Sequence, residues 1–591
     1  MKNVALSINV EQNMNRRIYI FIFILLWITN SYAQQHKANI SLVLAEKTAI
    51  NHLKVHDGNK QLPVFGLQDL NMICVNFGFK YNSVFDSLVN KYTKVDTLSK
   101  IYDSNNISSL NDLNDRLKLY NYVILKTDGN LSKLLISFIK EIEKNKKVII
   151  VQKGYSGGIS TDFKSSVIAT DLNDELSAAC AAKEIFGGIA VNGKAVRLNY
   201  TVPESVGMNA DKLDTIAAIM KDAIDAKGTP GAVVLIVKNG NVIYHKAFGS
   251  HKYDRVRTTK ADDIYDMASI TKLAATTNTT MKLVDDGKLS VDSVVTKYIA
   301  RTRGMPEKKD LKIKEILLHQ AGFFPYIKFY EYLKPKDTDT LYSKEYPTQL
   351  ADGYFLRKNY FEDTMWPAML NDQLLTRGKY VYSDLSMYYM KEVVEKVSLT
   401  PLNVFAADHF YKPLGMQRAG FLPRQRFEKD NIVPTTENDG WLRSMPVQGF
   451  VNDPGAAMLG GVSGHAGFFA SANDMAILGQ MWLNKGSYGG WNYIKAETLE
   501  RFTSSQSQVS RRGYGFDRKD SDPAKGYPST LASNEVFGHT GYTGTAIWVD
   551  PKHDLVYVFL SNRVYPDDKN KALNTLNTRS KIMDVIYRAM H

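Results

Sequence analysis

The chain has 591 residues, of which 44% are hydrophobic and 23% are charged, and its formal net charge is +13. This composition is that of a globular protein of roughly two to four domains, and it excludes a disordered or collagen-like chain. The positive charge does not indicate a nucleic-acid partner, because the lysines are scattered and form no basic stripe with interleaved aromatic residues. We expect a solvated basic surface instead.

Residues 1–33 have the pattern of a secretory signal peptide. A basic start runs from Met14 to Arg17, and Met14 is a possible true start. An unbroken apolar run follows from Ile18 to Ile28, and Ser31 to Ala33 ends it with small residues at the two positions that matter for cleavage. The run is too short for a comfortable membrane span. We therefore expect a secreted, periplasmic protein without a stable membrane span after cleavage.

Residues 34–199 are predicted to form a doubly wound α/β sandwich domain. Short apolar runs typical of buried parallel strands alternate with stretches of helical periodicity. The predicted strands are Met72–Val75, Tyr122–Leu125, Val148–Val151 and Val167–Ala169, and the predicted helices are Ser83–Tyr92, Leu131–Lys144 and Asp174–Phe186. No Gly-x-Gly-x-x-Gly motif follows the first strand, so a dinucleotide is not expected, and we predict no cofactor.

This region resembles a known domain at both of its ends. The segments Lys47–Pro63 and Glu175–Lys194 are similar to the first and last segments of the α/β sandwich at the C-terminal end of family 3 glycoside hydrolases. In that family a catalytic barrel precedes the sandwich, whereas here the predicted signal peptide joins it almost directly. Glycoside hydrolysis needs a carboxylate pair flanking the bond. The resemblance therefore implies a structural domain or one that contacts glycans.

The two cysteines belong to different predicted elements. Cys74 lies in a predicted strand and Cys180 in a predicted helix. Export would permit a disulfide, but two separate buried thiols are the expected arrangement. No cluster of histidine, cysteine and aspartate has the spacing of metal ligands, so no metal is expected.

Residues 200–591 are predicted to form a second domain. Asp211–Lys227 has the periodicity of an amphipathic helix. Gly231–Gly249 is a β-hairpin closed by an Asn-Gly turn, the strongest short-range hairpin signal. A further hairpin begins at His539, and Ser471–Asp474 has the residues of a helix start.

The residues with the clearest chemistry are Ser269 and Lys272. If a helix begins here, the two side chains lie one turn apart on one face, and an amine beside a hydroxyl can activate it as a nucleophile. The free N–H groups of a helix start would favour developing negative charge. The spacing alone is weak, because Ser137 and Lys140 repeat it in a charged helical stretch with nothing catalytic nearby.

Two later motifs give the first one its weight. Tyr382-Ser383-Asp384 and His539-Thr-Gly follow Ser269-x-x-Lys272 in this order. Together they resemble the three motifs of the serine β-lactamase and penicillin-binding-protein family, including class C β-lactamases, D-Ala-D-Ala carboxypeptidases and related esterases. For residues 200–591 the resemblance implies an antiparallel sheet flanked by helices, with a helical subdomain.

The resemblance also implies a role for each motif residue. Ser269 would be the nucleophile, and Lys272 and Tyr382 would share the base and acid roles, with the first proton acceptor left open. Asp384 would orient Lys272, and the backbone N–H groups of Ser269 and Tyr542 would hold the oxyanion. The implied substrate-binding residues are Asp384, His539, Thr540, Gly541 and Tyr542.

Two residues depart from the family pattern. Asp384 stands where the family often has asparagine, and His539 stands where many members have lysine. An ionised aspartate donates no hydrogen bond, and histidine is mostly neutral at neutral pH. Both changes argue mildly for ester or peptide substrates over classical β-lactams. Glycines at 541 and 544 are expected to leave room for a substrate backbone.

Other residues near the motifs remain ambiguous. His319 is expected to cap or pack rather than catalyse, and His465, in a glycine-rich loop, is a weaker candidate for a substrate contact. The segment 323–380 is rich in aromatic residues, which either wall the site or pack a satellite core.

The leading hypothesis is a secreted serine hydrolase that forms a covalent acyl-enzyme on ester or amide substrates, D-Ala-D-Ala peptides among them. The expected partner is a small molecule or a cell-wall peptide. One alternative is a true class C-like β-lactamase. The other is a non-catalytic envelope or glycan-binding protein with a vestigial serine site.

Overall fold

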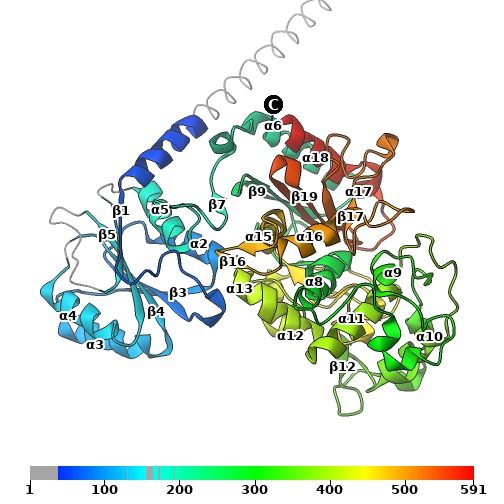
Figure 1. Ribbon diagram of the computed structural model, residues 1–591. Helices are drawn as coiled ribbons and strands as arrows, with labels where there is room; N and C mark the ends of the chain where they lie inside the picture. Colours follow the sequence, from blue (N-terminus) through cyan, green and yellow to red (C-terminus); the bar gives the residue numbers. More distant parts are fainter. Residues whose placement is uncertain (1–37, 130, 155–163, 171–173, 192, 591) are drawn as a thin grey trace, which may run out of the picture.

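The computed structural model describes residues 38–129, 131–154, 164–170, 174–191 and 193–590. The predicted signal peptide lies outside these residues. Within the described ranges no helix is both long and apolar enough to cross a membrane. Figure 1 shows two parts side by side, an N-terminal part in blue and cyan and a C-terminal part in green to red.

The N-terminal part is built on a six-stranded sheet of order β1-β6-β5-β4-β2-β3. Strands β2 to β6 run parallel, and β1 pairs antiparallel with β6. All four predicted strands are confirmed, whereas β1 and β3 are additional edge strands whose exposed, polar positions hide the strand pattern. The strands are β1 Leu53–Asp57, β2 Met72–Phe77, β3 Val95–Ile101, β4 Tyr122–Thr127, β5 Lys147–Lys153 and β6 Ser166–Thr170.

Helices cover both faces of this sheet, as expected for a doubly wound domain. α2 (Asn82–Tyr92) and α5 (Glu175–Phe186) pack on one face, and α3 (Ile107–Arg116) and α4 (Lys133–Ile142) pack on the other. Of these four helices α3 was not predicted, because its ten residues carry few apolar positions, and a further helix over residues 38–51, ahead of β1, was not predicted either. Cys74 and Cys180 are both buried, free thiols, as predicted.

The C-terminal part contains a seven-stranded sheet of order β17-β18-β19-β20-β8-β9-β7. It is antiparallel except for the short β7–β9 pair. The predicted Asn-Gly turn joins β8 to β9 with φ 52° at Asn239 and 73° at Gly240. The strands are β7 Asn199–Tyr200, β8 Gly231–Lys238, β9 Asn241–Gly249, β17 Asp517–Arg518, β18 Phe537–Thr540, β19 Ala546–Asp550 and β20 Leu555–Ser561.

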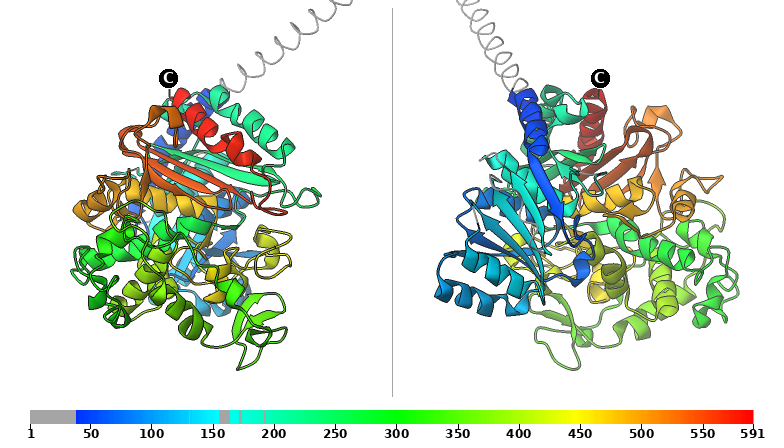
Figure 2. Two further views of the ribbon diagram at one scale, coloured as in Figure 1. Left: turned by 90° about the vertical axis from the view of Figure 1, so that its right-hand side faces the viewer. Right: turned by 60° about the vertical axis from the view of Figure 1, so that its left-hand side comes forward.

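Alternating side chains of these strands fill two cores. One face packs against α7 (Ile216–Asp225) and α18 (Thr578–Arg588), and the other against α15 (Ala472–Leu483). Figure 2 shows α18 outside the sheet in both views. The predicted helix over 211–227 is split, with α6 (Ala210–Asp214) preceding α7, and the predicted start of α15 is confirmed by a capping box between Ser471 and Asp474.

A mainly helical region lies under the α15 face of the sheet (Figure 1). Its helices are α8 Asn278–Asp285, α9 Ile313–Leu317, α10 Trp366–Asn371, α11 Leu385–Ser398, α12 Leu402–Ala406, α13 Lys412–Leu414, α14 Pro454–Met458 and α16 Ala496–Thr503. The remaining short elements are β10 Tyr265–Asp266, β11 Thr338–Asp339, β12 Thr348–Ala351, β13 Tyr354–Leu356, β14 Phe469–Ala470, β15 Ser487–Tyr488, β16 Trp491–Asn492 and α17 Ala572–Thr575.

The two parts contact each other through polar bonds at several places. Glu46 is ion-paired with Lys183 of α5 and accepts a hydrogen bond from Thr201 at 2.8 Å, next to β7. Gln417 donates to the carbonyl of Asn90, and Asn473 donates to that of Lys91. The N-terminal part is therefore attached to the helical region as well as to the connecting strand.

Candidate functional site

Ser269 lies in a tight turn between β10 and the central helix. The turn is a 3-10 helix, Ala268–Ile270, followed by a π-helix, Lys272–Thr277, and then by α8. The helix start expected here is confirmed, although its first turns are not α-helical. Short π segments occur often at functional sites.

The residue before Ser269 adopts an unusual backbone conformation. Ala268 has φ 47°, a left-handed value that costs about 1 kcal/mol for a residue with a Cβ. The buried carboxylate of Asp266 stabilises this turn, because it accepts hydrogen bonds from the Ala268 N–H at 2.8 Å and the Asn452 N–H at 2.7 Å. Burial raises the pKa of Asp266 to about 6.

The three predicted catalytic residues meet at the hydroxyl of Ser269. Lys272 Nζ lies 2.8 Å from Ser269 Oγ, and Tyr382 Oη lies 3.0 Å from the same oxygen. The Lys272 ammonium also lies 4.9 Å from the centre of the Tyr382 ring. The fold thus brings together an amine and a phenol from distant parts of the chain.

Lys272 is completely buried and is held by oxygen atoms. Its Nζ lies 2.7 Å from Asp384 Oδ1 and 3.4 Å from the carbonyl oxygen of His465. Burial alone would lower the pKa of Lys272, but the charges and hydrogen bonds of Asp384 and Tyr382 outweigh it, so the pKa lies above its ordinary value. Lys272 is therefore an ammonium at neutral pH, paired with Asp384 as the sequence predicted.

The third motif forms the open end of β18. His539 and Thr540 lie beyond the part of β18 that pairs with the two-residue edge strand β17. His539 Nδ1 lies 2.7 Å from the Thr540 carbonyl oxygen. Burial and the neighbouring guanidinium of Arg512 lower the pKa of His539 to about 3, so the imidazole is neutral.

The two glycines allow close packing within the chain. A Cβ at Gly541 would lie 2.2 Å from Thr545 Oγ1 and 2.6 Å from the carbonyl oxygen of Met267, and a Cβ at Gly544 would lie 2.2 Å from Ser561 Oγ. Gly541 thus allows β18 to pack closely on the turn that holds Ser269. That the glycines also leave room for a substrate backbone stays a prediction.

This close packing places Tyr542 beside Ser269, and both residues line the same cavity. Arg563 donates to the Tyr542 carbonyl oxygen from Nε at 2.9 Å and Nη2 at 2.7 Å, which fixes the orientation of that peptide group. The Tyr542 hydroxyl is bonded to Asp568. The two residues whose N–H groups are predicted to hold the oxyanion thus line one cavity.

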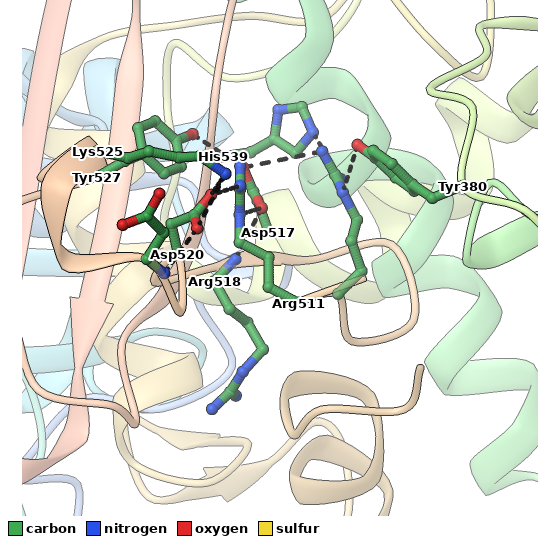
Figure 3. Close-up of polar contacts among 10 residues, drawn as sticks. Tyr380, Arg511, Asp517, Arg518, Asp520, Lys525, Tyr527 and His539 are labelled. Carbon is green, nitrogen blue, oxygen red and sulfur yellow. Dashed lines mark hydrogen bonds and ion pairs between the residues drawn. The ribbon is translucent and has the colours of Figure 1, made fainter. Parts of the chain in front are cut away.

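Arg512 is a site residue that the sequence analysis missed. Its Nη1 lies 3.2 Å from His539 Nε2, its Nε donates to Tyr380 Oη at 3.1 Å, and its guanidinium lies 5.3 Å from the centre of the Tyr382 ring. Figure 3 shows the cluster, with Tyr380 at its right-hand edge and Asp517, Asp520 and Lys525 to the left.

The cluster has an excess of positive charge. Asp517 pairs with Arg511 at 2.7 Å and with Arg512 at 3.8 Å, while Asp520 pairs with Arg511 and Lys525. Because Arg512 donates to Nε2 of His539, that nitrogen is an acceptor and the ring proton sits on Nδ1. A lysine at 539 is therefore replaced by a neutral imidazole bonded to a buried, permanent cation.

On the opposite side of Ser269 a cavity of about 360 Å³ opens. Tyr326, Phe329 and Tyr330 from the aromatic segment line it, together with Trp441. Other aromatic residues of the same segment, Phe323, Tyr360 and Trp366, belong to the main core. The segment therefore does both things that the sequence left open, although the core it fills is not a satellite.

His465 lies at the wall of this cavity. Its Nε2 is 2.8 Å from Asp453 Oδ1, and its Nδ1 is 2.9 Å from Ser463 Oγ. One ligand atom from each of Asp384, Asp453 and His465 lies within 4.8 Å of the others, a grouping that the sequence spacing did not reveal. The Lys272 ammonium, paired with Asp384, already neutralises part of this charge.

Comparison with known proteins decides the family. A family model described as "Beta-lactamase" matches residues 216–579, which is more than half of the chain. This chain belongs to the β-lactamase family. It is accordingly a serine hydrolase of the β-lactamase and penicillin-binding-protein type, as its three motifs predicted.

Two similar proteins each cover more than half of this chain. A protein of Escherichia coli O157:H7 named "Putative D-alanyl-D-alanine carboxypeptidase" is 31% identical over 389 residues, which are 62% of this chain and 86% of that protein. A protein of Salmonella gallinarum with the same name is 30% identical over 401 residues, which are 64% of this chain and 88% of that protein.

Several solved structures resemble part of this chain. EstCE1, described as a hydrolase with promiscuous acyltransferase activity, is 20% identical, with a TM-score of 0.48 and coverage of 64% of this chain and 99% of that one. A class C β-lactamase from Rhodobacter sphaeroides is 16% identical, with a TM-score of 0.46 and coverage of 63% and 99%. These likenesses concern the fold alone.

Proposed function

We propose that this β-lactamase-family protein is a secreted serine carboxypeptidase that removes the last residue from D-alanyl-D-alanine peptides through a covalent acyl-enzyme. The observation that carries the proposal is the contact between Arg512 and His539 at 3.2 Å. The buried guanidinium gives the β18 end of the site a permanent positive charge, which suits a substrate with a free terminal carboxylate. The names of the relatives at 30–31% identity support the same substrate class.

This proposal revises one argument made from the sequence. A neutral His539 in place of lysine suggested a weak grip on a carboxylate. Arg512, 27 residues earlier in the chain, compensates for the missing lysine charge. The substrate carboxylate would lie at the end of β18, near His539 and Thr540, within the field of the guanidinium. The Thr540 hydroxyl would supply a hydrogen bond there.

Acylation begins with attack of Ser269 Oγ on the carbonyl carbon between the two alanines. Lys272, as an ammonium, has no lone pair to accept a proton, so at 2.8 Å it donates to Ser269 Oγ. In the structure the Tyr382 hydroxyl donates to Ser269 Oγ at 3.0 Å, so Tyr382 must first lose that proton and react as the phenolate. The hydroxyl proton of Ser269 then passes to the phenolate oxygen. We therefore assign Tyr382 as the first proton acceptor.

Two cations support this role of Tyr382. The ammonium of Lys272 lies 4.9 Å and the guanidinium of Arg512 lies 5.3 Å from the centre of its ring. Positive charge near a phenol stabilises the phenolate. The negative charge that develops on the carbonyl oxygen would be bound by the N–H groups of Ser269 and Tyr542, a contribution worth about 3 kcal/mol per donor in related sites.

The tetrahedral intermediate collapses when the C–N bond breaks. Tyr382 returns its proton to the leaving nitrogen, and the terminal D-alanine departs with its carboxylate. A water molecule then attacks the Ser269 ester and gives a proton to the Tyr382 phenolate. When the ester C–O bond breaks, Tyr382 passes this proton to Ser269 Oγ, so the shortened peptide leaves and both the serine hydroxyl and the phenolate are restored. The remaining part of the peptide would occupy the aromatic cavity on the other side of Ser269.

The alternatives predict different substrates. A true β-lactamase would turn over nitrocefin, an esterase would prefer p-nitrophenyl esters, and a vestigial site would do neither. Residues 34–199 are proposed to be a structural or glycan-contacting domain, and secretion follows from the predicted signal peptide. The polar bonds to the helical region support the structural role.

The test compares two substrates and one covalent label on the purified protein and its Ser269→Ala variant. We expect D-alanine release from a peptide ending in D-Ala-D-Ala, slow or absent turnover of nitrocefin, and labelling of the wild type by a fluorophosphonate. The Ser269→Ala variant should lose both labelling and activity. Intact labelling of that variant would refute the assignment of the nucleophile, and rapid nitrocefin turnover without D-alanine release would refute the substrate class.

A further inference from the structure

His319 has three features that a packing residue does not need. It is 1% exposed, it follows α9 with a left-handed φ of 55°, and its ring centre lies 4.7 Å from that of Tyr382. Left-handed backbone is uncommon outside glycine, although histidine adopts it more often than most residues. The contacts of His319 with the residues on either side of Tyr382 distinguish it from a packing residue.

His319 accepts two hydrogen bonds from the segment around Tyr382. The Val381 N–H donates to the His319 carbonyl oxygen at 3.0 Å. The Ser383 N–H donates to His319 Nδ1 at 3.2 Å. These donors are the residues immediately before and after Tyr382. One residue thus binds the backbone on both sides of the phenol and packs against the phenol ring itself.

The side-chain bond requires a neutral ring. Because Nδ1 accepts a hydrogen bond from the Ser383 N–H, the ring proton must be on Nε2, which has no hydrogen-bond partner among the described residues. Burial lowers the pKa of His319 well below its ordinary value, and the nearby charges of Arg512 and Lys272 lower it further. Nδ1 of His319 therefore remains a hydrogen-bond acceptor at any pH at which the enzyme works.

The left-handed backbone of His319 makes this arrangement possible. The Ser383 bond is made by the ring and the Val381 bond by the carbonyl oxygen, so ring and carbonyl must both reach the 381–383 segment. A helix end in the left-handed region turns the chain out of α9 and lets both groups do so.

We propose that His319 is a positioning residue for Tyr382, which sets the phenol oxygen at its distance from Ser269 by binding the backbone on each side of it. This inference rests on the proton-transfer role proposed above for Tyr382. It assigns no contact with substrate to His319. A displacement of the phenol by about 1 Å would be enough to slow proton transfer about 100-fold.

The test is a double-mutant cycle between His319 and Tyr382. The rate constant for labelling of Ser269 by a fluorophosphonate is measured in the wild type, His319→Leu, Tyr382→Phe and the double variant. We expect His319→Leu to slow labelling about 100-fold in the wild-type background. In the Tyr382→Phe background the same change should cost less than about 3-fold, because no phenol oxygen remains to be positioned.

Two matched variants separate the effect of the hydrogen-bond acceptor at Nδ1 from the effect of the ring. In His319→Asn, the amide oxygen can occupy the position of Nδ1, and asparagine tolerates left-handed backbone better than most residues. In His319→Gln, the amide lies at the position of Nε2, where no partner is lost or gained. We expect His319→Asn to recover at least 10-fold of the rate lost in His319→Leu, and His319→Gln to recover little.

The outcomes are distinct. Equal losses from His319→Leu in both Tyr382 backgrounds would overturn the inference, because a purely structural residue acts regardless of the phenol. Failure of His319→Asn to exceed His319→Gln would also overturn it. If the wild type itself is not labelled, the proposed nucleophile is wrong rather than this inference. Thermal unfolding of every variant identifies any that fail to fold, and if His319→Leu is one of them, the cycle is run with His319→Gln in its place.

Discussion

Asp384 Oδ1 lies 2.7 Å from Lys272 Nζ, inside a site where the lysine is completely buried. A buried ammonium is stable only when a partner charge compensates for lost hydration. Asp384 is the main such partner for Lys272, and it raises a pKa that burial would otherwise lower. An asparagine at this position would lack this compensation. The aspartate therefore determines which group takes the serine proton.

The first prediction concerns Asp384→Asn. Removing the carboxylate leaves burial as the dominant influence, so the pKa of Lys272 should fall. If the Lys272 ammonium is the active form, as proposed, kcat/KM of the variant should decline at a lower pH than that of the wild type as pH rises. A pH–rate profile between pH 6 and 11 measures this shift, with Asp384→Glu as the control that retains the charge. A variant that becomes faster at neutral pH would instead show that the free amine is the base.

The second prediction concerns Arg512. Arg512→Met should lower kcat/KM for a peptide with a free terminal carboxylate about 30- to 100-fold, the usual effect of losing a charged hydrogen bond. For the same peptide with a C-terminal amide the loss should be less than about 5-fold. Arg511→Lys is the matched control, because Arg511 contacts Asp517 and Asp520 and lies away from His539. An equal loss of kcat/KM for the two peptides would show that Arg512 does not recognise the terminal carboxylate.

The third prediction concerns the pH dependence that His539 does not produce. Its pKa of about 3 leaves it neutral throughout the working range. We expect the kcat/KM profiles of the wild type and of His539→Gln to have the same shape between pH 5 and 8. The amide oxygen of the glutamine can still accept a hydrogen bond from Arg512. A change of kcat/KM with pH that the wild type shows and the variant lacks would mean that His539 titrates near neutrality. His539→Lys should be strongly destabilised, because it places a second cation beside a buried guanidinium.

The fourth prediction concerns acid stability. Burial would raise the pKa of Asp453, but the charge and hydrogen bond of His465 outweigh it and lower the pKa to about 2. An unfolded aspartate titrates near ~3.9. The carboxylate therefore stabilises the fold above about pH 4, and this contribution is lost as pH falls toward 2.

Thermal unfolding between pH 2 and 6 tests this. The Tm of Asp453→Asn should lie below that of the wild type at pH 6, and the difference should shrink toward pH 2. Exposed Asp408, replaced by asparagine, serves as the control and should change neither value. Asp266 acts in the opposite sense, since its pKa of about 6 favours the folded state at low pH and that contribution is lost as pH rises through 6. A constant Tm difference at all pH values would contradict the assignment to Asp453.

The sequence was informative wherever the signal is local. Buried parallel strands such as β4 and β5 are continuous apolar runs, and the hairpin of β8 and β9 is closed by Asn239 and Gly240. Edge strand β3 was missed because its residues do not alternate between apolar and polar, and helix α3 because only three of its ten residues are apolar, of which Ile107 is exposed. A local sequence pattern indicates which residues are buried, and a partly exposed element has few buried residues to indicate.

The candidate site shows the same division. Ser137 and Lys140 have the spacing of Ser269 and Lys272, but in the structure Ser137 donates to the carbonyl of Lys133 on an exposed helix. The order of three motifs distinguished the two serines. Nothing local identified Arg512, which lies in a loop and reaches His539 only through the packing of that loop on β18.

By itself the sequence determined the family, the nucleophile and the residues that surround it, because short motifs at helix starts and strand ends carry their own geometry. Only the tertiary structure decided the charges on those residues. Whether Lys272 carries a proton depends on its burial and on Asp384, and whether the site retains a cation depends on Arg512 rather than His539. Electrostatic energies are set by distances between groups far apart in the chain and by their exclusion from water, and neither quantity is written in a linear pattern.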